Sequence, residues 1–205
     1  MRYIDFQQVF SPLGCFDINQ VRMVQPNFDR TALNRWVANG YLMQLRNGVY
    51  AFKQWSTQPG VNFIAANRIC RPSYISMYSA LSHYGMIPEF VAQTTSVTTL
   101  KTATFNNALG SFKYHHVKSN LFFGYHNIES TTQRDIFIAT PEKALIDLLY
   151  LFPVLKTEQD MLELRLDEEF MGEDFDYNEA HTILQRIGSK TLSHRFTLLE
   201  NTYRQ

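Results

Sequence analysis

The tripeptide Arg46-Asn47-Gly48 lies between two short apolar segments and strongly limits how the first part of the chain can fold. Asn-Gly is the strongest short-range signal for a tight turn between antiparallel strands. We therefore expect a hairpin with strands over residues 41–45 and 49–52. Gly40 stands directly before the first strand, where a helix commonly ends in a left-handed residue. A helix followed at once by a hairpin is thus the expected local structure.

Three short helices are expected before this hairpin, over residues 4–10, 18–24 and 30–39. Asp17 and Asp29 precede the second and third helices, at the position where an aspartate side chain caps free backbone N–H groups. The order of helix, helix, turn, helix and hairpin is that of a winged helix-turn-helix, a fold that commonly binds DNA.

Hydrogen-bonding side chains occupy the outer face of the third helix, the turn before it and the tip of the hairpin. A helix in the major groove reads bases with such residues, since arginine forks onto guanine and asparagine or glutamine onto adenine. A wing reaches the phosphates or the minor groove. The candidate DNA-binding residues are Gln25, Asn27, Arg30, Thr31, Asn34, Arg35, Arg46 and Asn47.

The formal net charge of the chain is zero, but the charge is unevenly distributed. Residues 1–53 hold six basic and three acidic side chains, whereas residues 153–205 hold six and eleven. Attraction to phosphate acts over about 8–10 Å, so the local excess of positive charge is what matters for DNA binding. The neutral total does not exclude a nucleic-acid partner.

Residues 54–60 are polar, contain a Pro-Gly pair and form the expected linker to a second domain over residues 61–205. The fold class we expect is α+β, in which a small antiparallel sheet with surrounding helices follows the winged helix-turn-helix. The expected helices cover residues 61–69, 74–84, 141–151, 177–187 and 189–203, with Ser73, Thr140 and Thr157 as caps. The expected strands cover residues 94–99, 111–117, 121–125 and 135–138.

Three segments of the chain resemble one family. FDRTALNRWVANGYLMQLRNGVYAF from Phe28, PSYISMYSALSHYGMIPE from Pro72 and IATPEKALIDLLY from Ile138 are similar to the AbiEi family, the antitoxins of type IV (abortive-infection) toxin–antitoxin systems. The resemblance implies a bacterial or archaeal protein whose winged helix represses its own operon and whose larger domain opposes a nucleotidyltransferase-type toxin. It places Arg30, Asn34 and Arg35 on the recognition helix and Arg46 on the wing.

The residues that suggest catalysis or metal binding lack the spacing that such sites need. Asp135, Glu142 and Lys143 resemble a nuclease set, but that set needs its Glu and Lys two positions apart on one strand. His115 and His116 are neighbours on an expected strand and point to opposite faces. We therefore expect no catalytic residues, no metal and no cofactor.

The function expected from the sequence is a DNA-binding autorepressor and antitoxin. Its partners would be double-stranded DNA at the chain's own promoter and a cognate toxin. The alternatives are a stand-alone regulator whose second domain senses a ligand or partner and, less favoured, a nucleic-acid enzyme. The chain lacks a long apolar run and an N-terminal leader and holds only two cysteines, so we expect a cytoplasmic protein without membrane contact.

Overall fold

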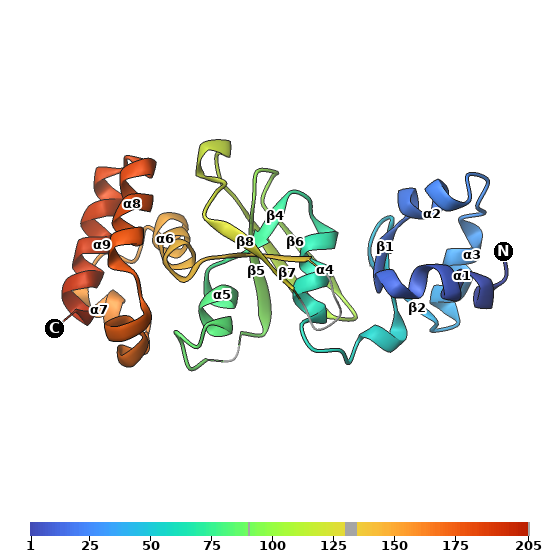
Figure 1. Cartoon of the computed structure of the whole chain (residues 1–205), viewed down its shortest axis with the longest axis horizontal. Coiled ribbons are helices and arrows are strands. Elements are labelled where there is room, and N and C mark those ends of the chain that lie inside the picture. The colour runs from blue at the N-terminus through green and yellow to red at the C-terminus, as the bar shows by residue number, and fades with distance from the viewer. Residues whose placement is uncertain (90, 130–134, 205) are drawn as a thin grey trace.

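A computed structural model describes residues 1–89, 91–129 and 135–204 of the chain. In it the chain is an α+β protein with helices and two separate β-sheets (Figure 1). In the part that the structure describes, no helix is both long enough and apolar enough to cross a membrane.

The N-terminal part alternates short helices and strands around an antiparallel sheet with the order β1-β3-β2. Its elements are α1 (Tyr3–Phe10), η1 (Ser11–Leu13), β1 (Cys15–Asp17), α2 (Ile18–Val24), α3 (Thr31–Ala38), β2 (Leu42–Arg46) and β3 (Val49–Phe52). The three helices and the hairpin agree with the sequence prediction to within one or two residues. The strand β1 was missed, because three residues are too few to show an alternating pattern.

The core of this part is aromatic and lies between the helices and one face of the sheet. Phe6 of α1 is fully buried, with its ring centroid 4.7 Å from that of Trp36 on α3 and 5.3 Å from that of Phe16 on β1. Such ring pairs stabilise a small core beyond the apolar area that they bury.

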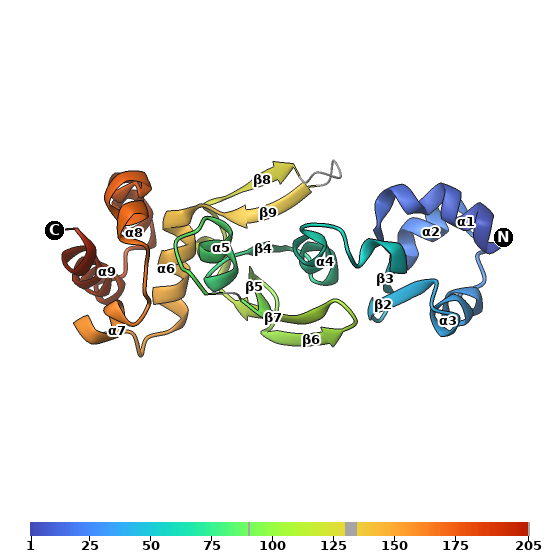
Figure 2. The same cartoon turned by 90° about the horizontal axis from the view of Figure 1, so that it is seen from below.

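The opposite face of the same sheet is also buried, because it packs against the rest of the chain. Side chains alternate along a strand, so Cys15, Met43 and Ala51, which pair across the sheet, share this face. They belong to the same hydrophobic cluster as Ile64 and Ile69 of α4. The side chain of Asn107 spans the same boundary and donates to the carbonyl of Leu45 (3.1 Å). Figure 2 shows this sheet next to α4.

The predicted linker includes the end of a short turn of helix, η2 (Lys53–Trp55), and ends at Gly60, the residue before α4. The division into residues 1–53 and 61–205 stays a prediction. The apolar contact across the sheet nevertheless means that the two parts share a buried boundary.

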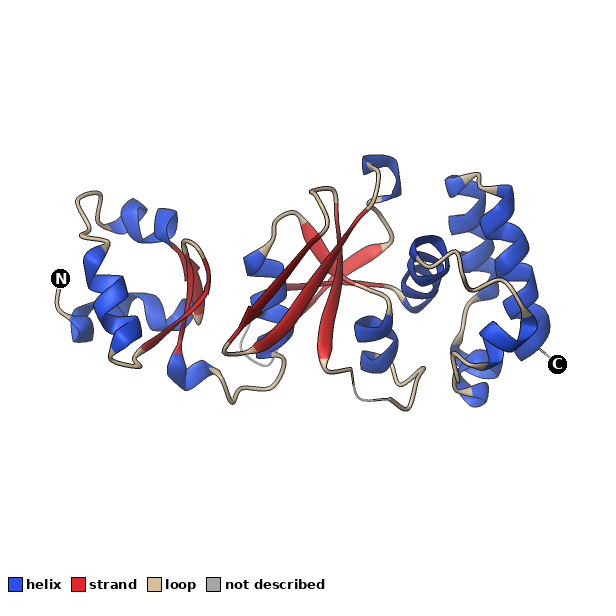
Figure 3. Cartoon of the chain, turned by 180° about the vertical axis from the view of Figure 1, so that it is seen from behind, coloured by secondary structure: helices blue, strands red, loops and turns tan. Residues whose placement is uncertain are grey.

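The larger part contains a sheet of six strands among the described residues, in the order β6-β7-β5-β4-β9-β8. Its strands are β4 (Ser73–Ile75), β5 (Gln93–Thr98), β6 (Ala103–Asn107), β7 (Gly110–His116), β8 (Tyr125–Glu129) and β9 (Asp135–Ala139). Its helices are α4 (Val61–Ile69), α5 (Tyr78–His83), α6 (Pro141–Leu151), α7 (Glu158–Leu162), α8 (Tyr177–Ile187) and α9 (Lys190–Tyr203), with short turns η3 (Ser119–Leu121) and η4 (Phe170–Asp174). Figure 3 shows the sheet in the middle of the molecule, with α7 to α9 at the end opposite the N-terminal part.

Three predictions for this part were wrong. The sheet is mixed, not antiparallel, because β4 pairs with β9 and β5 with β7 in parallel. Ser73 does not cap a helix; it begins β4, and its hydroxyl donates to the carbonyl of Cys70 (2.6 Å). Residues 121–125 are not a strand, since β8 starts only at Tyr125.

Candidate nucleic-acid interface

The outer face of α3 is exposed because the helix buries its other face in the aromatic core. Leu33 and Trp36, three residues apart, are buried, with Trp36 only 3% exposed. Thr31, Asn34 and Arg35 are exposed. The prediction that Asp29 caps this helix was wrong, because α3 starts one residue later than predicted and its N-cap is Arg30. The Asp29 carboxylate still accepts hydrogen bonds from the Thr31 backbone N–H (2.9 Å) and the Thr31 hydroxyl.

The turn before α3 presents one of its two predicted contact residues fully. α2 begins with a capping box in which Asp17 accepts from the backbone of Asn19 and Gln20. After α2, Asn27 is exposed. The side-chain oxygen of Gln25, by contrast, is buried and has no hydrogen-bond partner among the described residues, so this amide is less available to a ligand.

The hairpin tip and the start of α3 are joined by a hydrogen bond. The Arg30 guanidinium donates to the Asn47 side-chain oxygen at 2.6 Å. Gly48 allows the turn with a φ of +81°, and its carbonyl accepts from the backbone N–H of Ile18 (3.0 Å). Seven of the eight predicted contact residues are exposed, and six of them lie on α3, in the turn before it or at the hairpin tip: Asn27, Arg30, Thr31, Asn34, Arg35 and Asn47. The seventh exposed residue is Arg46.

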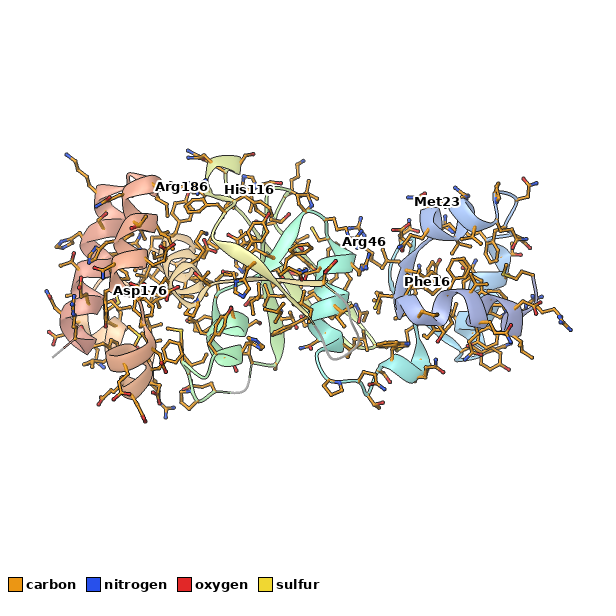
Figure 4. All side chains as sticks on the ribbon, viewed as in Figure 1. Phe16, Met23, Arg46, His116, Asp176 and Arg186 are labelled. Atoms are coloured by element: carbon orange, nitrogen blue, oxygen red, sulfur yellow. The ribbon has the colours of Figure 1, made fainter. Side chains whose placement is uncertain are left out.

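Arg46 is turned towards the larger part of the molecule. A bulge after Gln44 shifts the register so that Arg46 pairs with Val49, which belongs to the buried boundary. The Arg46 guanidinium donates to the carbonyl of Ile69 (2.6 Å) and lies 5.3 Å from the centre of the Phe105 ring. Figure 4 shows the labelled Arg46 between the N-terminal part and α4. A regular hairpin was assumed from the sequence, and the bulge changes which way this side chain points.

Exposed arginines lie on α2, at the start of α3 and on α3 itself. Arg22, Arg30 and Arg35 are exposed, and Arg22 was not singled out from the sequence although it lies in the last turn of α2. Asp29 is the acidic group at this surface, and the hydrogen bond from Thr31 holds the pKa of its carboxyl below the usual value. The carboxylate therefore stays ionised and partly offsets Arg35.

Two of the three residues that suggested a nuclease site, Glu142 and Lys143, are buried in the larger part and engaged in structural contacts, whereas Asp135 is exposed. The Lys143 ammonium is fully buried, where it donates to the hydroxyl of Tyr74 (2.9 Å) and to the carboxylate of Asp147. Ser76 donates to the other oxygen of Asp147 (2.8 Å). Burial raises the pKa of Asp147, while Lys143 and the two hydroxyls lower it. Glu142 accepts from the backbone N–H of Asp176 (3.3 Å).

The histidines and cysteines do not form a metal-binding set in the described ranges. No group of three His, Cys, Asp or Glu side chains there could hold a metal ion. The ring of His115 lies 5.6 Å from that of Phe152, and His116 bonds to the carbonyl of Leu100 (3.0 Å). Cys15 and Cys70 are both buried, and the thiol of Cys70 donates to the hydroxyl of Thr98 (3.7 Å).

Two arginines near the end of α4 were not predicted from the sequence as site residues. Arg68 in the last turn of α4 and Arg71 just after it border a pocket in the larger part of the molecule. The sequence held no local signal for them, because the other walls of the pocket come from β4, β8 and β9.

Comparison with known proteins adds no relative. No protein-family model matches the chain, and no curated protein matches it.

Proposed function

We propose that the N-terminal part is a winged helix-turn-helix that binds double-stranded DNA. In this proposal α3 lies in the major groove and the β2–β3 turn lies against the backbone. The observation that carries the proposal is the hydrogen bond from Arg30 to Asn47, which joins the start of the helix to the tip of the hairpin. One continuous polar surface is thereby available to a duplex.

The element order supports this assignment. α1, β1, α2, α3, β2 and β3 follow one another as in winged helices, and α3 leaves its polar face free. The major groove admits one helix, and Asn34 and Arg35 have the side chains that fork onto adenine and guanine. Arg30 and Asn47 would then contact the DNA backbone and fix the position of the protein on the duplex.

The exposed charge sets the expected salt dependence. Arg30 and Arg35 are exposed at this surface and Arg22 is exposed on α2, whereas Arg46 contacts Ile69 and Arg2 pairs with Asp5 (3.2 Å). Neutralising about three phosphates per chain gives a log–log salt slope of roughly −3.

A titration of labelled duplexes tests the DNA proposal. The full chain is mixed with the DNA upstream of its own gene and with a scrambled duplex at several salt concentrations. Arg35→Ala should cost about 1–3 kcal/mol on the upstream DNA and less on the scrambled duplex. The matched control is Lys156→Ala, since Lys156 is exposed beyond α6. Binding that ignores salt, or an equal loss from both substitutions, contradicts the proposal.

We further propose that the chain is an autorepressor and antitoxin of the AbiEi type, with residues 61–205 opposing a nucleotidyltransferase-type toxin. The support is the resemblance of three segments to that family. The structure adds a reason for two of these segments: Tyr74 and Ser76 from one meet Lys143 and Asp147 from the other in a single buried network. The motifs therefore preserve a connection between β4 and α6.

Co-expression with the neighbouring toxin gene tests the antitoxin role. The full chain should restore growth, and an Asn34→Ala/Arg35→Ala variant, produced from an unrelated promoter, should restore it too while operator binding is lost. The second result separates repression from toxin neutralisation. Failure of the full chain to restore growth contradicts the antitoxin proposal and leaves the DNA proposal to its own test.

A further inference from the structure

A pocket in the larger part of the molecule lies outside the proposed DNA surface. It has a volume of about 610 Å³ and is bordered by the end of α4, the start of β4, the residues before β8 and the start of β9. This volume is within the range of about 300–1,000 Å³ that is typical of small-molecule sites. Its lining combines aromatic rings with two guanidinium groups.

Three aromatic side chains form its apolar wall. The Tyr125 ring is 5.2 Å from that of Phe122 and 6.1 Å from that of Phe137, centroid to centroid. The rings of Tyr125 and Phe137 are nearly perpendicular. Tyr125 itself is held by stacking on the buried Tyr74 at 4.7 Å. Phe137 is 39% exposed, which is unusual for so large an apolar side chain. A flat ring in the pocket would cover this apolar surface.

The wall is fixed in place by Asn67. Its side-chain oxygen accepts from the backbone N–H of Phe137 (2.8 Å), and its amide nitrogen donates to the carbonyls of Ser73 (3.3 Å) and Phe137 (3.4 Å). All parts of this buried amide are therefore used, and α4 is tied to both β4 and β9. The pocket is pre-formed, and Asn67 serves as a support.

Arg68 and Arg71 place two positive charges at the mouth of this pocket. Arg68 is half-buried, and burial together with the charge of Arg71 lowers its pKa. Among the described residues its guanidinium has no hydrogen bond and no ion pair within 4.0 Å, while Arg71 donates through Nε to the carbonyl of Asn67 (3.3 Å). The two neighbouring guanidinium groups repel each other, and the negative charges of Asp17 and Asp135 offset this repulsion only in part. Arginine is well suited to phosphate.

Asp135 adds a negative charge to the pocket lining, which also contains the two arginines. Its carboxylate accepts from the Asn127 side chain (2.5 Å) and lines the pocket together with Phe137. A carboxylate disfavours an anion beside it but accepts hydrogen bonds from an amino group.

We propose that this pocket binds a nucleoside monophosphate, with the base against Phe122, Tyr125 and Phe137 and the phosphate on Arg68 and Arg71. Bases stack on aromatic side chains whatever their sequence identity, and a phosphate pairs with arginine. The proposal does not depend on DNA binding by α3, because the two surfaces share no residue.

Isothermal titration of the full chain, without DNA, tests the proposal. The probes are AMP, GMP, CMP and UMP, with adenosine and inorganic phosphate as the separate halves of the ligand. At least one nucleotide should bind saturably, and adenosine and phosphate should each bind about tenfold more weakly than the best nucleotide.

Variants connect the binding to the pocket. Arg68→Gln and Phe137→Ala should each weaken nucleotide binding about tenfold, whereas Lys156→Gln should leave it unchanged. Phe137 and Arg71 are exposed, so Phe137→Ala and Arg71→Gln keep the test valid if Arg68→Gln impairs folding. Circular dichroism checks that each variant is folded.

Three results would overturn the proposal. They are the absence of saturable binding up to about 1 mM of every nucleotide, equal binding by all variants, and Arg68-dependent binding of a single-stranded oligonucleotide without any binding of mononucleotides.

Discussion

Replacing Arg46 with alanine separates a role in DNA binding from a role in holding the two parts together. The Arg46 guanidinium donates to the carbonyl of Ile69 at 2.6 Å and lies 5.3 Å from the centre of the Phe105 ring. Both partners belong to the larger part of the chain. Arg46→Ala should therefore lower the free energy of unfolding while leaving the exposed face of α3 intact.

The expected loss is about 2 kcal/mol. A hydrogen bond from a charged donor contributes about 1.5–3 kcal/mol, and an exposed cation–π contact about 0.5–1 kcal/mol. Arg46 remains exposed in part, so the lower value of each range applies. For a chain of this length, 1 kcal/mol corresponds to roughly 2–4 °C, which gives a fall in Tm of about 4–8 °C.

Urea denaturation measures this loss. Unfolding is followed by circular dichroism and by tryptophan fluorescence, because Trp36 and Trp55 both lie in the N-terminal part. The matched control is Arg22→Ala, an exposed arginine on α2 whose removal should change stability by no more than about 0.5 kcal/mol. If Arg46→Ala unfolds like the native chain and instead weakens binding to every duplex, the side chain is a DNA contact and our interpretation of the boundary is wrong.

Three further predictions follow from burial. Lys143→Met leaves the Asp147 carboxylate buried without its cation, so it should lower the free energy of unfolding by about 3–5 kcal/mol in urea denaturation. The Lys143→Met/Asp147→Leu double variant should lose less free energy than the sum of the two single variants. Strict additivity would contradict the coupling between the two side chains. A fragment of residues 1–53 exposes the sheet face that includes Leu45, so it should self-associate in analytical sedimentation. Leu45→Lys should reduce this association. A monomeric native fragment would argue against an apolar boundary between the two parts of the chain. Burial lowers the pKa of His83, so the neutral imidazole contributes fully to the free energy of unfolding above the pKa of the unfolded chain, about 6.5, and this contribution is lost as the pH falls through the pKa of the folded chain. His83→Gln should therefore flatten the dependence of the free energy of unfolding on pH in this range. An unchanged slope would contradict this prediction.

The elements that the sequence predicted well have strong end signals or long apolar periodicity. α4 and α8 have the predicted bounds, and the side chains of Asp17 and Thr140 cap α2 and α6 as expected. These features are local, since a capping side chain bonds within three residues of its own position.

The elements that failed depend on distant partners. β4 resembles the start of a helix in sequence, but its three residues are buried and pair with β5 on one side and β9 on the other. Pairing of this kind overrides local preference. Met77, with a φ of 55°, then separates the strand from α5. β6 was missed because its alternating residues are polar or only half-buried.

The residues of the candidate site also differ in whether local sequence or a distant partner determines their position. The exposed face of α3 follows from the spacing of Leu33 and Trp36 within one helix, which a sequence can show. The direction of Arg46 depends on a bulge in β2 and on the position of Phe105, about sixty residues later in the chain. The pocket beside Arg68 joins α4 to β8 and β9, so no local pattern could have indicated it.

The buried network of Tyr74, Ser76, Lys143 and Asp147 shows how a sequence motif can carry fold without carrying function. Its polar atoms are hydrogen-bonded to one another, and an added Cβ at Gly124 would come within 2.9 Å of the Lys143 side chain. Each of these residue types is thus required by its neighbours. The motifs at these positions therefore connect β4 to α6. The exposed residues of α3 and the lining of the pocket beside Arg68 lie outside this network, so these motifs do not identify what either surface binds.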